Sequence, residues 1–131
     1  MWWRDPFELE RAADIAKTLQ YFKPTELMSN DGRPGVPQPI AMKALDNLRH
    51  VLNKPLIINS AYRSPQWNKL VGGAKHSYHV KGLAFDIDTK EWTPNERMCL
   101  THAAGVLGFH GLGMYDTFIH IDMGPHRRWI G

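Results

Sequence analysis

The stretch Ser77-Tyr-His-Val-Lys-Gly-Leu-Ala-Phe-Asp-Ile-Asp88 decides the fold around it, because its sequence pattern changes from that of a loop to that of a strand at Gly82. After Gly82, apolar residues alternate with small or acidic ones, which is typical of a strand with one face on a core. Asp86 therefore projects from the face opposite the apolar residues, whereas His79 lies in the preceding loop. Gly82 permits the backbone angles of a sharp turn into the strand. The pattern predicts a loop and a strand that bring an imidazole and a carboxylate together.

A second alternating stretch, Asp116-Thr-Phe-Ile-His-Ile-Asp-Met123, places His120 and Asp122 on one face and isoleucines on the other. A single histidine in an apolar strand is more often a hydrogen-bonded structural residue than a metal ligand. In combination with His79 and Asp86, however, His120 completes a set of three nitrogen and oxygen donors. Catalytic zinc sites usually have three protein ligands and one open position. We therefore expect a zinc site built from a loop and two strands.

Several segments together resemble the M15 family of zinc peptidases, which includes D-alanyl-D-alanine carboxypeptidases, dipeptidases and phage endolysins. They are Ser77-x-His79-x-x-Gly82-x-Ala84-x-Asp86, Phe118-Ile-His120-Ile-Asp122, Ser60-Ala-Tyr-Arg-Ser-Pro65, Asn68, Val71-Gly-Gly-Ala74 and Asp122-Met-Gly-Pro-His-Arg-Arg-Trp129. The resemblance runs from about Tyr21 to Trp129 and is strongest to the compact peptidoglycan endopeptidases. It implies an α+β fold like that of hedgehog domains and D-Ala-D-Ala peptidases, with a small central antiparallel sheet flanked by helices. It also implies that His79, Asp86 and His120 bind Zn²⁺.

The resemblance extends to residues that would act on the substrate. Arg63 occupies the position of an arginine that clasps a substrate carboxylate or a developing oxyanion, and a structural salt bridge is an equally weighted alternative. His76 is expected at the edge of the substrate site. Ser77 is expected either to bind the peptide or to steady the loop.

The general base is the least defined part of this prediction. Many relatives carry an acidic residue three positions before the last ligand histidine, where this chain has Thr117. Asp116 ranks first as a substitute, provided that a turn brings it near, because four residues of strand span ~13 Å. Asp122 ranks second as the base and first as the group that orients an imidazole ligand.

The composition is that of one ordinary globular domain. The chain has 131 residues, of which 43% are hydrophobic and 22% charged, so we expect a single domain over residues 1–131 with a helical extension over 1–20. The net charge of +3 comes from scattered Lys and Arg residues. Without a basic stripe we expect no nucleic-acid partner. The single cysteine, Cys99, excludes a cysteine-based zinc site, and we expect it to be buried.

Apolar residues recur at helical spacing in four segments, 7–21, 40–52, 65–70 and 94–107. Val51 belongs to the apolar stripe of the second, and Met98 and Val106 to that of the fourth, which begins at the capping box Thr93-Pro-Asn-Glu96. Strands are predicted over 56–59, 83–88, 109–114 and 117–123, with a tight turn at Tyr115-Asp116. The C-terminal residues 127–129 are expected to close over the domain or to line its cleft.

The amino terminus lacks the basic and apolar segments of a secretory signal, and no stretch approaches the ~20 apolar residues of a membrane span. We therefore expect a protein that is made in the cytoplasm. Separately, we expect it to be a monomer. Delivery to the cell wall would then occur by phage-driven lysis or as a virion component.

Together these patterns predict a zinc-dependent peptidase that hydrolyses amide bonds in the stem or cross-link peptides of peptidoglycan. It would be either an endopeptidase or a D,D-carboxypeptidase, and the sequence leaves open which bond is cut. Two other classes are considered: a non-catalytic zinc-binding module of the same fold, as in hedgehog domains, and a metal-dependent nuclease.

Overall fold

Five strands form one mixed sheet, and its central strands carry the alternating patterns of the sequence. The computed structural model describes residues 1–131. The strands are β1 (Ile58–Ser60), β2 (Ala84–Asp88), β3 (Gly111–Met114), β4 (Phe118–Asp122) and β5 (Arg127–Ile130), in the spatial order β1-β2-β4-β3-β5. All neighbouring strands are antiparallel except β3 and β5, which run parallel.

The helices are α1 (Pro6–Thr18), the short 3-10 helix η1 (Pro24–Glu26), α2 (Pro39–Leu52), α3 (Pro65–Leu70) and α4 (Pro94–Val106). Each begins with a proline. The first N–H groups of a helix have no partner within it, so proline loses no hydrogen bond at this position, and its φ is already helical. The predicted capping box at the start of α4 is present, with Thr93 and Glu96 each accepting the other's backbone N–H. The α+β fold predicted from the sequence is confirmed. None of these helices has the length and apolar character needed to cross a bilayer.

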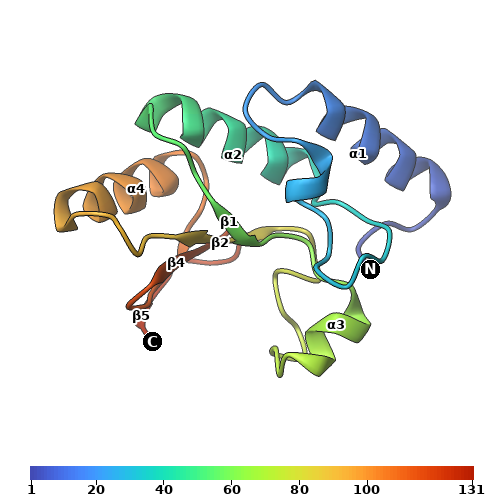
Figure 1. Cartoon of the computed structure of the whole chain (residues 1–131). Helices are drawn as coiled ribbons and strands as arrows, with labels where there is room; N and C mark the ends of the chain where they lie inside the picture. Colours follow the sequence, from blue (N-terminus) through green and yellow to red (C-terminus); the bar gives the residue numbers. More distant parts are fainter.

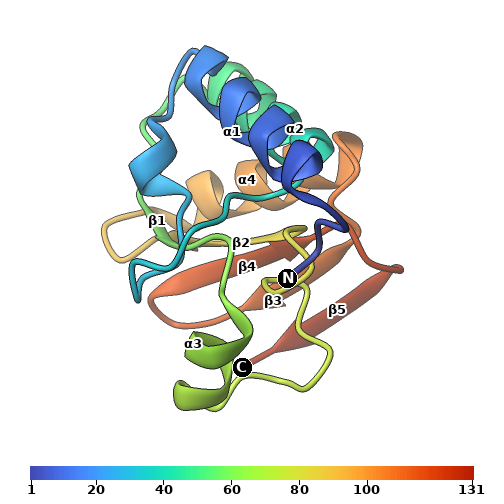
Figure 2. The same ribbon diagram turned by 90° about the vertical axis from the view of Figure 1, so that its right-hand side faces the viewer.

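The helices divide between the two faces of the sheet. Helices α1, α2 and α4 gather over one face, whereas α3 and the loop that leads to β2 lie on the other side (Figure 1 and Figure 2). The core between the sheet and helices α1, α2 and α4 includes fully buried residues of β2 (Phe85, Ile87), β4 (Ile119, Ile121) and α2 (Leu45, Leu48). The polar alternate residues of β2 and β4 are thereby directed to the face that carries α3.

Helix α1 shares this core. Its small residues Ala12 and Ala16 are fully buried in the same cluster as the residues of α2, which lets the two helices approach closely. Ahead of α1, the indole N–H of Trp2 donates to the carbonyl of Val36, at 2.7 Å. The first twenty residues therefore pack against the rest of the fold.

Helix α4 turns a different face to the core from the one that its periodicity predicted. Leu100 and Ala104 are fully buried, whereas Met98 and Val106 are 66% and 73% exposed, and Cys99 is exposed. The predicted burial of these last three residues is wrong. Apolar residues are spread around α4, so its contact with α2 selects the buried side.

The C-terminal residues form a strand that the sequence analysis did not predict. In β5, Arg127 is opposite Gly111 of β3, and Trp129 is opposite Gly113. The expected sheet was wholly antiparallel, and this parallel pair at its edge is the exception. It can form because β4 returns the chain to the start of β3 before β5 begins.

Two residues of α2 test which face of this helix is buried. Leu48 is fully buried, whereas Val51, which the sequence placed on the same apolar stripe, is 62% exposed. We expect Leu48→Ala to lower the free energy of unfolding by about 2–5 kcal/mol, because it leaves a cavity. The matched Val51→Ala variant is expected to change it by less than about 0.5 kcal/mol. Denaturant unfolding measures both, and equal losses would contradict the observed packing.

Candidate metal centre

Asp86 and His120 face each other across the two central strands. The antiparallel register of β2 and β4 pairs Asp86 with His120 and Ala84 with Asp122. Since side chains alternate along a strand, all four lie on the face directed away from the core. The Nδ1 atom of His120 is 2.9 Å from Oδ1 of Asp86. Strand pairing alone therefore brings two of the predicted ligands into contact.

His79 reaches the same place from the loop before β2. Gly82 ends this loop with a φ of +70°, which residues with a side chain rarely adopt. The N–H of Gly82 donates to the carbonyl of His79, at 3.1 Å. The hydroxyl of Ser77 accepts a hydrogen bond from the N–H of His79, also at 3.1 Å. Of the two roles considered for Ser77, this contact supports the steadying of the loop.

The imidazole of His79 is held in one orientation. Its Nδ1 atom is 2.8 Å from the carbonyl oxygen of Ala61, and because a carbonyl only accepts, Nδ1 carries a proton. The other nitrogen, Nε2, is buried and has no hydrogen-bond partner, although Oδ2 of Asp86 lies 3.2 Å away. A buried unpartnered nitrogen is costly unless something binds it. Among the features of the structure, this atom gives the strongest indication that the protein binds a metal ion here.

The donor atoms of His79, Asp86 and His120 all lie within 4.8 Å of one another. Their side chains are only 4%, 11% and 14% exposed, respectively. Two imidazole nitrogens and one carboxylate oxygen suit zinc, and three protein ligands leave the fourth position that a catalytic site needs. The residues present therefore fit the predicted zinc ion.

The charges of the cluster reinforce one another. Burial opposes the ionisation of Asp86, but its contacts with His120 and His79 outweigh burial and hold the pKa of this carboxyl well below its usual range. Burial also disfavours the charged form of His120. Hydrogen bonds to Asp122 and Asp86 and the charges of both carboxylates more than offset it and raise the pKa of His120 to about 8. Without a metal, His120 is thus a cation between two anions.

Asp122 lies behind His120. Its Oδ2 atom is 2.7 Å from Nε2 of His120, and its Oδ1 atom accepts from the N–H of Gly124, at 2.9 Å, and from Arg127, at 2.6 Å. The residue is 1% exposed. Metal-bound imidazoles commonly donate their second N–H to a carboxylate that fixes the ring. The geometry supports this orienting role for Asp122, and it leaves neither carboxylate oxygen free to act as a general base.

Arg63 follows β1, and its guanidinium approaches the same oxygen of Asp86 that faces His79. Its Nη2 atom is 3.5 Å from Oδ2 of Asp86, while Nε and Nη1 donate to Ser60 and Asn68, at 3.2 and 3.1 Å. The side chain is 17% exposed. Burial lowers the pKa of Arg63 and the charge of Asp86 opposes this shift. The guanidinium is therefore fixed at the rim of the cluster.

Two predicted site residues lie apart from the cluster. Asp116 is exposed in the turn between β3 and β4, which is closed by a hydrogen bond from the N–H of Tyr115 to the carbonyl of Phe118. It lines a surface hollow with Lys90 and Arg97 that includes none of the three metal ligands. The fold therefore gives no support to its first rank as general base. His76 is exposed on the loop before His79 and makes no side-chain hydrogen bond.

Three residues lie beside the metal ligands without having been predicted to support them, although residues 127–129 were expected to close over the domain or to line its cleft. The ring centroid of Trp129 is 5.3 Å from that of His120, and the guanidinium of Arg127 is close to the rings of both Trp129 and Tyr78. The signal for two of them was present in residues 127–129, because alternation places Arg127 and Trp129 on one face of a strand. It was missed because the segment was not predicted to be a strand.

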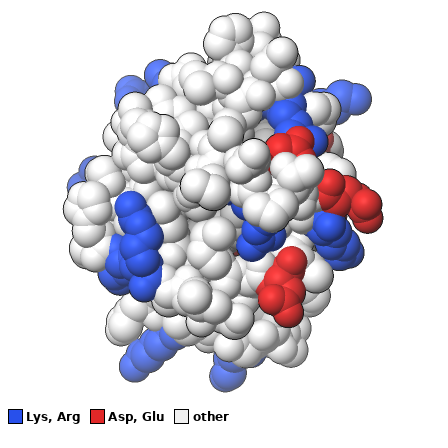
Figure 3. All heavy atoms as spheres, turned by 90° about the vertical axis from the view of Figure 1, so that its left-hand side faces the viewer, with Lys and Arg blue, Asp and Glu red and all other residues white.

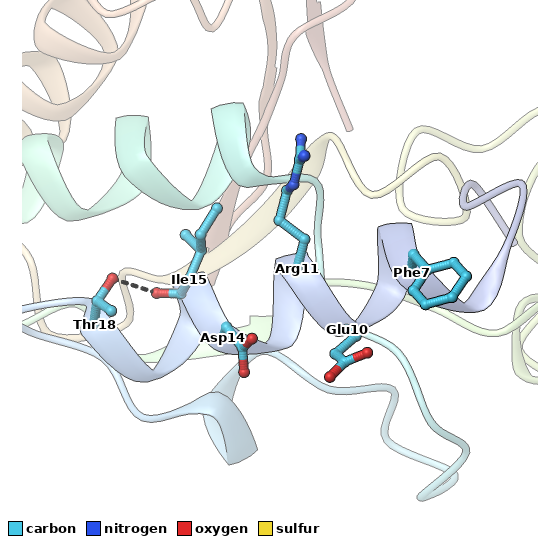
Figure 4. A pocket seen from close by; sticks show the side chains of 6 residues that line it. All are labelled: Phe7, Glu10, Arg11, Asp14, Ile15 and Thr18. Atoms are coloured by element: carbon cyan, nitrogen blue, oxygen red, sulfur yellow. Dashed lines mark hydrogen bonds between the residues drawn. The ribbon is translucent and has the colours of Figure 1, made fainter.

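An open hollow of about 430 Å³ lies elsewhere, along α1 (Figure 4). It is lined by Phe7, Glu10, Arg11, Asp14, Ile15 and Thr18. Acidic and basic side chains alternate along it, and α1 covers the face of the sheet opposite to the histidines. The size of a hollow therefore does not identify the functional site of this protein.

The charge cluster predicts how the metal-free protein responds to pH. His120 has a pKa of about 8 when folded, against 6.5 in a free histidine. The contribution of protonated His120 to the free energy of unfolding is therefore complete below pH 6.5 and is lost as the pH rises through 8. We expect a loss on the order of 1–2 kcal/mol across this range. Asp86, whose pKa is lowered, contributes above its free value of 3.8 and loses its contribution in acid.

Denaturant unfolding in the presence of a chelator measures this dependence. The His120→Gln variant serves as the control, because it lacks the titrating group and should remove the decline between pH 6.5 and 8. A decline of the same size in both proteins would assign it to another group.

The chain matches the family model of peptidase M15 over residues 11–122. It is similar to the peptidoglycan L,D-endopeptidases MepK of Escherichia coli strain K12 and Shigella flexneri, with 36% identity over 83 residues. It is also similar to the probable peptidoglycan L,D-endopeptidase MepK of Haemophilus influenzae, with 35% identity over 86 residues. These alignments cover 58% and 60% of the chain, and 44% and 45% of the relatives. The chain thus spans less than half the length of the curated relatives that it matches. Because the family match covers most of the chain and includes His79, Asp86 and His120, the chain belongs to the peptidase M15 family.

Proposed function

We propose that this chain is a zinc-dependent peptidase that cleaves a peptide bond in peptidoglycan. Its family provides the class of reaction, and the names of the relatives, peptidoglycan L,D-endopeptidases, indicate the substrate. The observation that carries the proposal is the buried Nε2 atom of His79, which has no hydrogen-bond partner and faces Asp86 within a cluster of three donors.

The ligands would be Nε2 of His79, a carboxylate oxygen of Asp86 and Nδ1 of His120. Zinc held there supplies Lewis-acid chemistry, polarising an amide carbonyl and lowering the pKa of water. To act as a ligand, His120 gives up the proton on Nδ1 and keeps the one on Nε2, which it donates to Asp122. Asp122 thus selects the tautomer that metal binding requires.

Arg63 would bind the substrate at the rim of the centre. Its contact with Asp86 is long, at 3.5 Å, compared with its hydrogen bonds to Ser60 and Asn68. Because this contact is long, Nη2 is the nitrogen of the guanidinium that would bind a substrate oxygen. The other two contacts keep the guanidinium in place, so that it can hold a carbonyl or carboxylate oxygen in a fixed position.

The bond that we propose first is an L,D-peptide bond, because that specificity is in the names of the relatives. Cleavage inside a cross-link peptide would make the protein an endopeptidase. The D,D-carboxypeptidase alternative differs in the product, since it releases a single terminal amino acid.

A non-catalytic zinc-binding module of the same fold is the second candidate. It is favoured by Thr117, which stands where many relatives have an acidic residue, and by the exposed position of Asp116 away from the ligands. A nuclease is less well supported. On the face drawn in Figure 3, Lys and Arg side chains form separate patches, with acidic groups beside several of them, and no continuous stripe for a phosphate backbone.

Hydrolysis of purified cross-linked peptidoglycan tests the proposal directly. We expect the protein to release peptide fragments, a chelator to abolish the release, and added zinc to restore it. His79→Ala should remove activity that zinc does not restore, whereas the control His102→Ala, an exposed histidine of α4, should remain active. Mass spectrometry of the fragments identifies the bond. Zinc binding without hydrolysis would establish the non-catalytic module, and nicking of plasmid DNA would favour the nuclease.

The roles of the two aspartates are separated by substitution. Asp122→Ala removes the acceptor behind His120, and we expect zinc affinity and turnover to fall by about 10- to 100-fold. Asp116→Ala changes an exposed turn residue and is expected to leave turnover unchanged. Steady-state kinetics at saturating zinc, together with the metal content of each variant, measures both effects. A large loss of turnover in the zinc-loaded Asp116→Ala protein would restore Asp116 as the general base.

A further inference from the structure

Arg127 stands on β5, outside the segment that the family model matches, and reaches across β3 to β4. Its Nη2 atom is 2.6 Å from Oδ1 of Asp122, and Nη1 is 3.3 Å from Oδ2. The two nitrogens of one guanidinium therefore contact both oxygens of one carboxylate. This fork fixes the direction of a carboxylate as well as neutralising it.

Glycines in β3 make this reach possible. A Cβ atom built on Gly111 would be 2.1 Å from Oδ1 of Asp122 and 2.7 Å from Nη2 of Arg127. A Cβ atom on Gly113 would lie 2.5 Å from the ring of Trp129. Any side chain at these two positions would therefore displace the groups beside His120. The absence of side chains at Gly111 and Gly113 thus leaves the space through which residues of β5 reach the metal centre.

Two aromatic rings lie against the guanidinium of Arg127. Its central carbon is 5.1 Å from the ring centroid of Tyr78 and 5.3 Å from that of Trp129. Tyr78 directly precedes His79, and the ring of Trp129 lies 5.3 Å from that of His120. Cation–π contact with two rings restricts the movement of the guanidinium that meets Asp122. Arg127 thus contacts the neighbours of two different metal ligands.

The burial of Asp122 makes this arginine necessary. The carboxylate is 1% exposed, and Arg127 is the only Lys or Arg side chain that forms an ion pair with it. A buried carboxylate without a counter-charge is strongly disfavoured. Without Arg127, the carboxylate of Asp122 would lose the fork that fixes its direction and could turn away from His120, which would remove the acceptor that His120 needs.

We propose that Arg127 is a positioning residue of the metal centre, which raises zinc affinity by fixing Asp122 behind His120 and by bracing the histidine loop through Tyr78. The proposal rests on the proposed function only in taking zinc to be the ion. Arg127 touches neither the metal ligands' donor atoms nor the substrate in this scheme. Its effect is expected on metal binding first, and on turnover through metal binding.

The experiment compares Arg127→Met and Arg127→Lys with Arg128→Met as the matched control. Arg128 is the next residue, is exposed, and donates only to backbone carbonyls. Zinc dissociation constants are measured by competition with a chromophoric chelator at pH 7, and the unfolding temperature of each metal-free protein is recorded. We expect Arg127→Met to weaken zinc binding by about 10- to 100-fold. Arg127→Lys, which keeps the charge but loses the fork, should fall between it and the wild type, and Arg128→Met should match the wild type.

The outcomes are distinct. A lower unfolding temperature in Arg127→Met with unchanged zinc affinity would show a purely structural role and overturn the proposal. If Arg127→Met does not fold, Arg127→Lys decides, and zinc binding equal to the wild type in that variant overturns the proposal as well. Failure of the wild-type protein to bind zinc would instead contradict the proposed function, so the two failures are told apart by the wild-type measurement.

Discussion

The register of β2 against β4, with Asp86 opposite His120, is the constraint on which the rest of the structure depends. Because side chains alternate along a strand, this register fixes two faces at once. One face of the pair is apolar and packs under α2 and α4, and the other carries the metal centre. A slip of either strand by one residue would turn its own ligand, Asp86 or His120, into the core and expose its apolar residues. The hydrophobic core therefore holds the chemical site in alignment.

A line of alternating charge crosses the sheet along this polar face. It runs from Arg63 through Asp86, His120 and Asp122 to Arg127, and each group contacts the next. Buried charges are tolerated only when such partners compensate them. The histidine in the middle is the group whose protonation a metal would change, and each carboxylate beside it has its own arginine. The outer members of the line thus support the ones at which zinc would bind.

The two halves of this line come from different parts of the fold. Arg63 is delivered by the turn after β1, and Arg127 by the parallel strand at the opposite edge of the sheet. The histidine loop between them is closed by Gly82 and steadied by Ser77. The centre is therefore assembled by segments distant in the sequence, and its precision derives from the rigid sheet and not from any single loop.

Local periodicity was sufficient to predict several features. Strands around Asp86 and His120, the helices with their proline starts, and the capping box at Thr93 all follow from short patterns whose physical causes act within a few residues. Periodicity did not identify the buried side of α4, where Cys99 proved exposed. An apolar helix has several faces that could be buried, and its packing partner decides among them.

The sequence by itself determined the chemical identity of the centre, because the types of donor and the alternation that directs them to one face are written in the chain. Tertiary structure alone decided between the two other aspartates and supplied the arginine behind the centre. Asp116 lies exposed in the turn between β3 and β4, whereas the pairing of β5 with β3 brings Arg127 to Asp122. The reason is that contacts between strands depend on register and on the order of strands in the sheet. Neither is encoded in the spacing of residues along one segment.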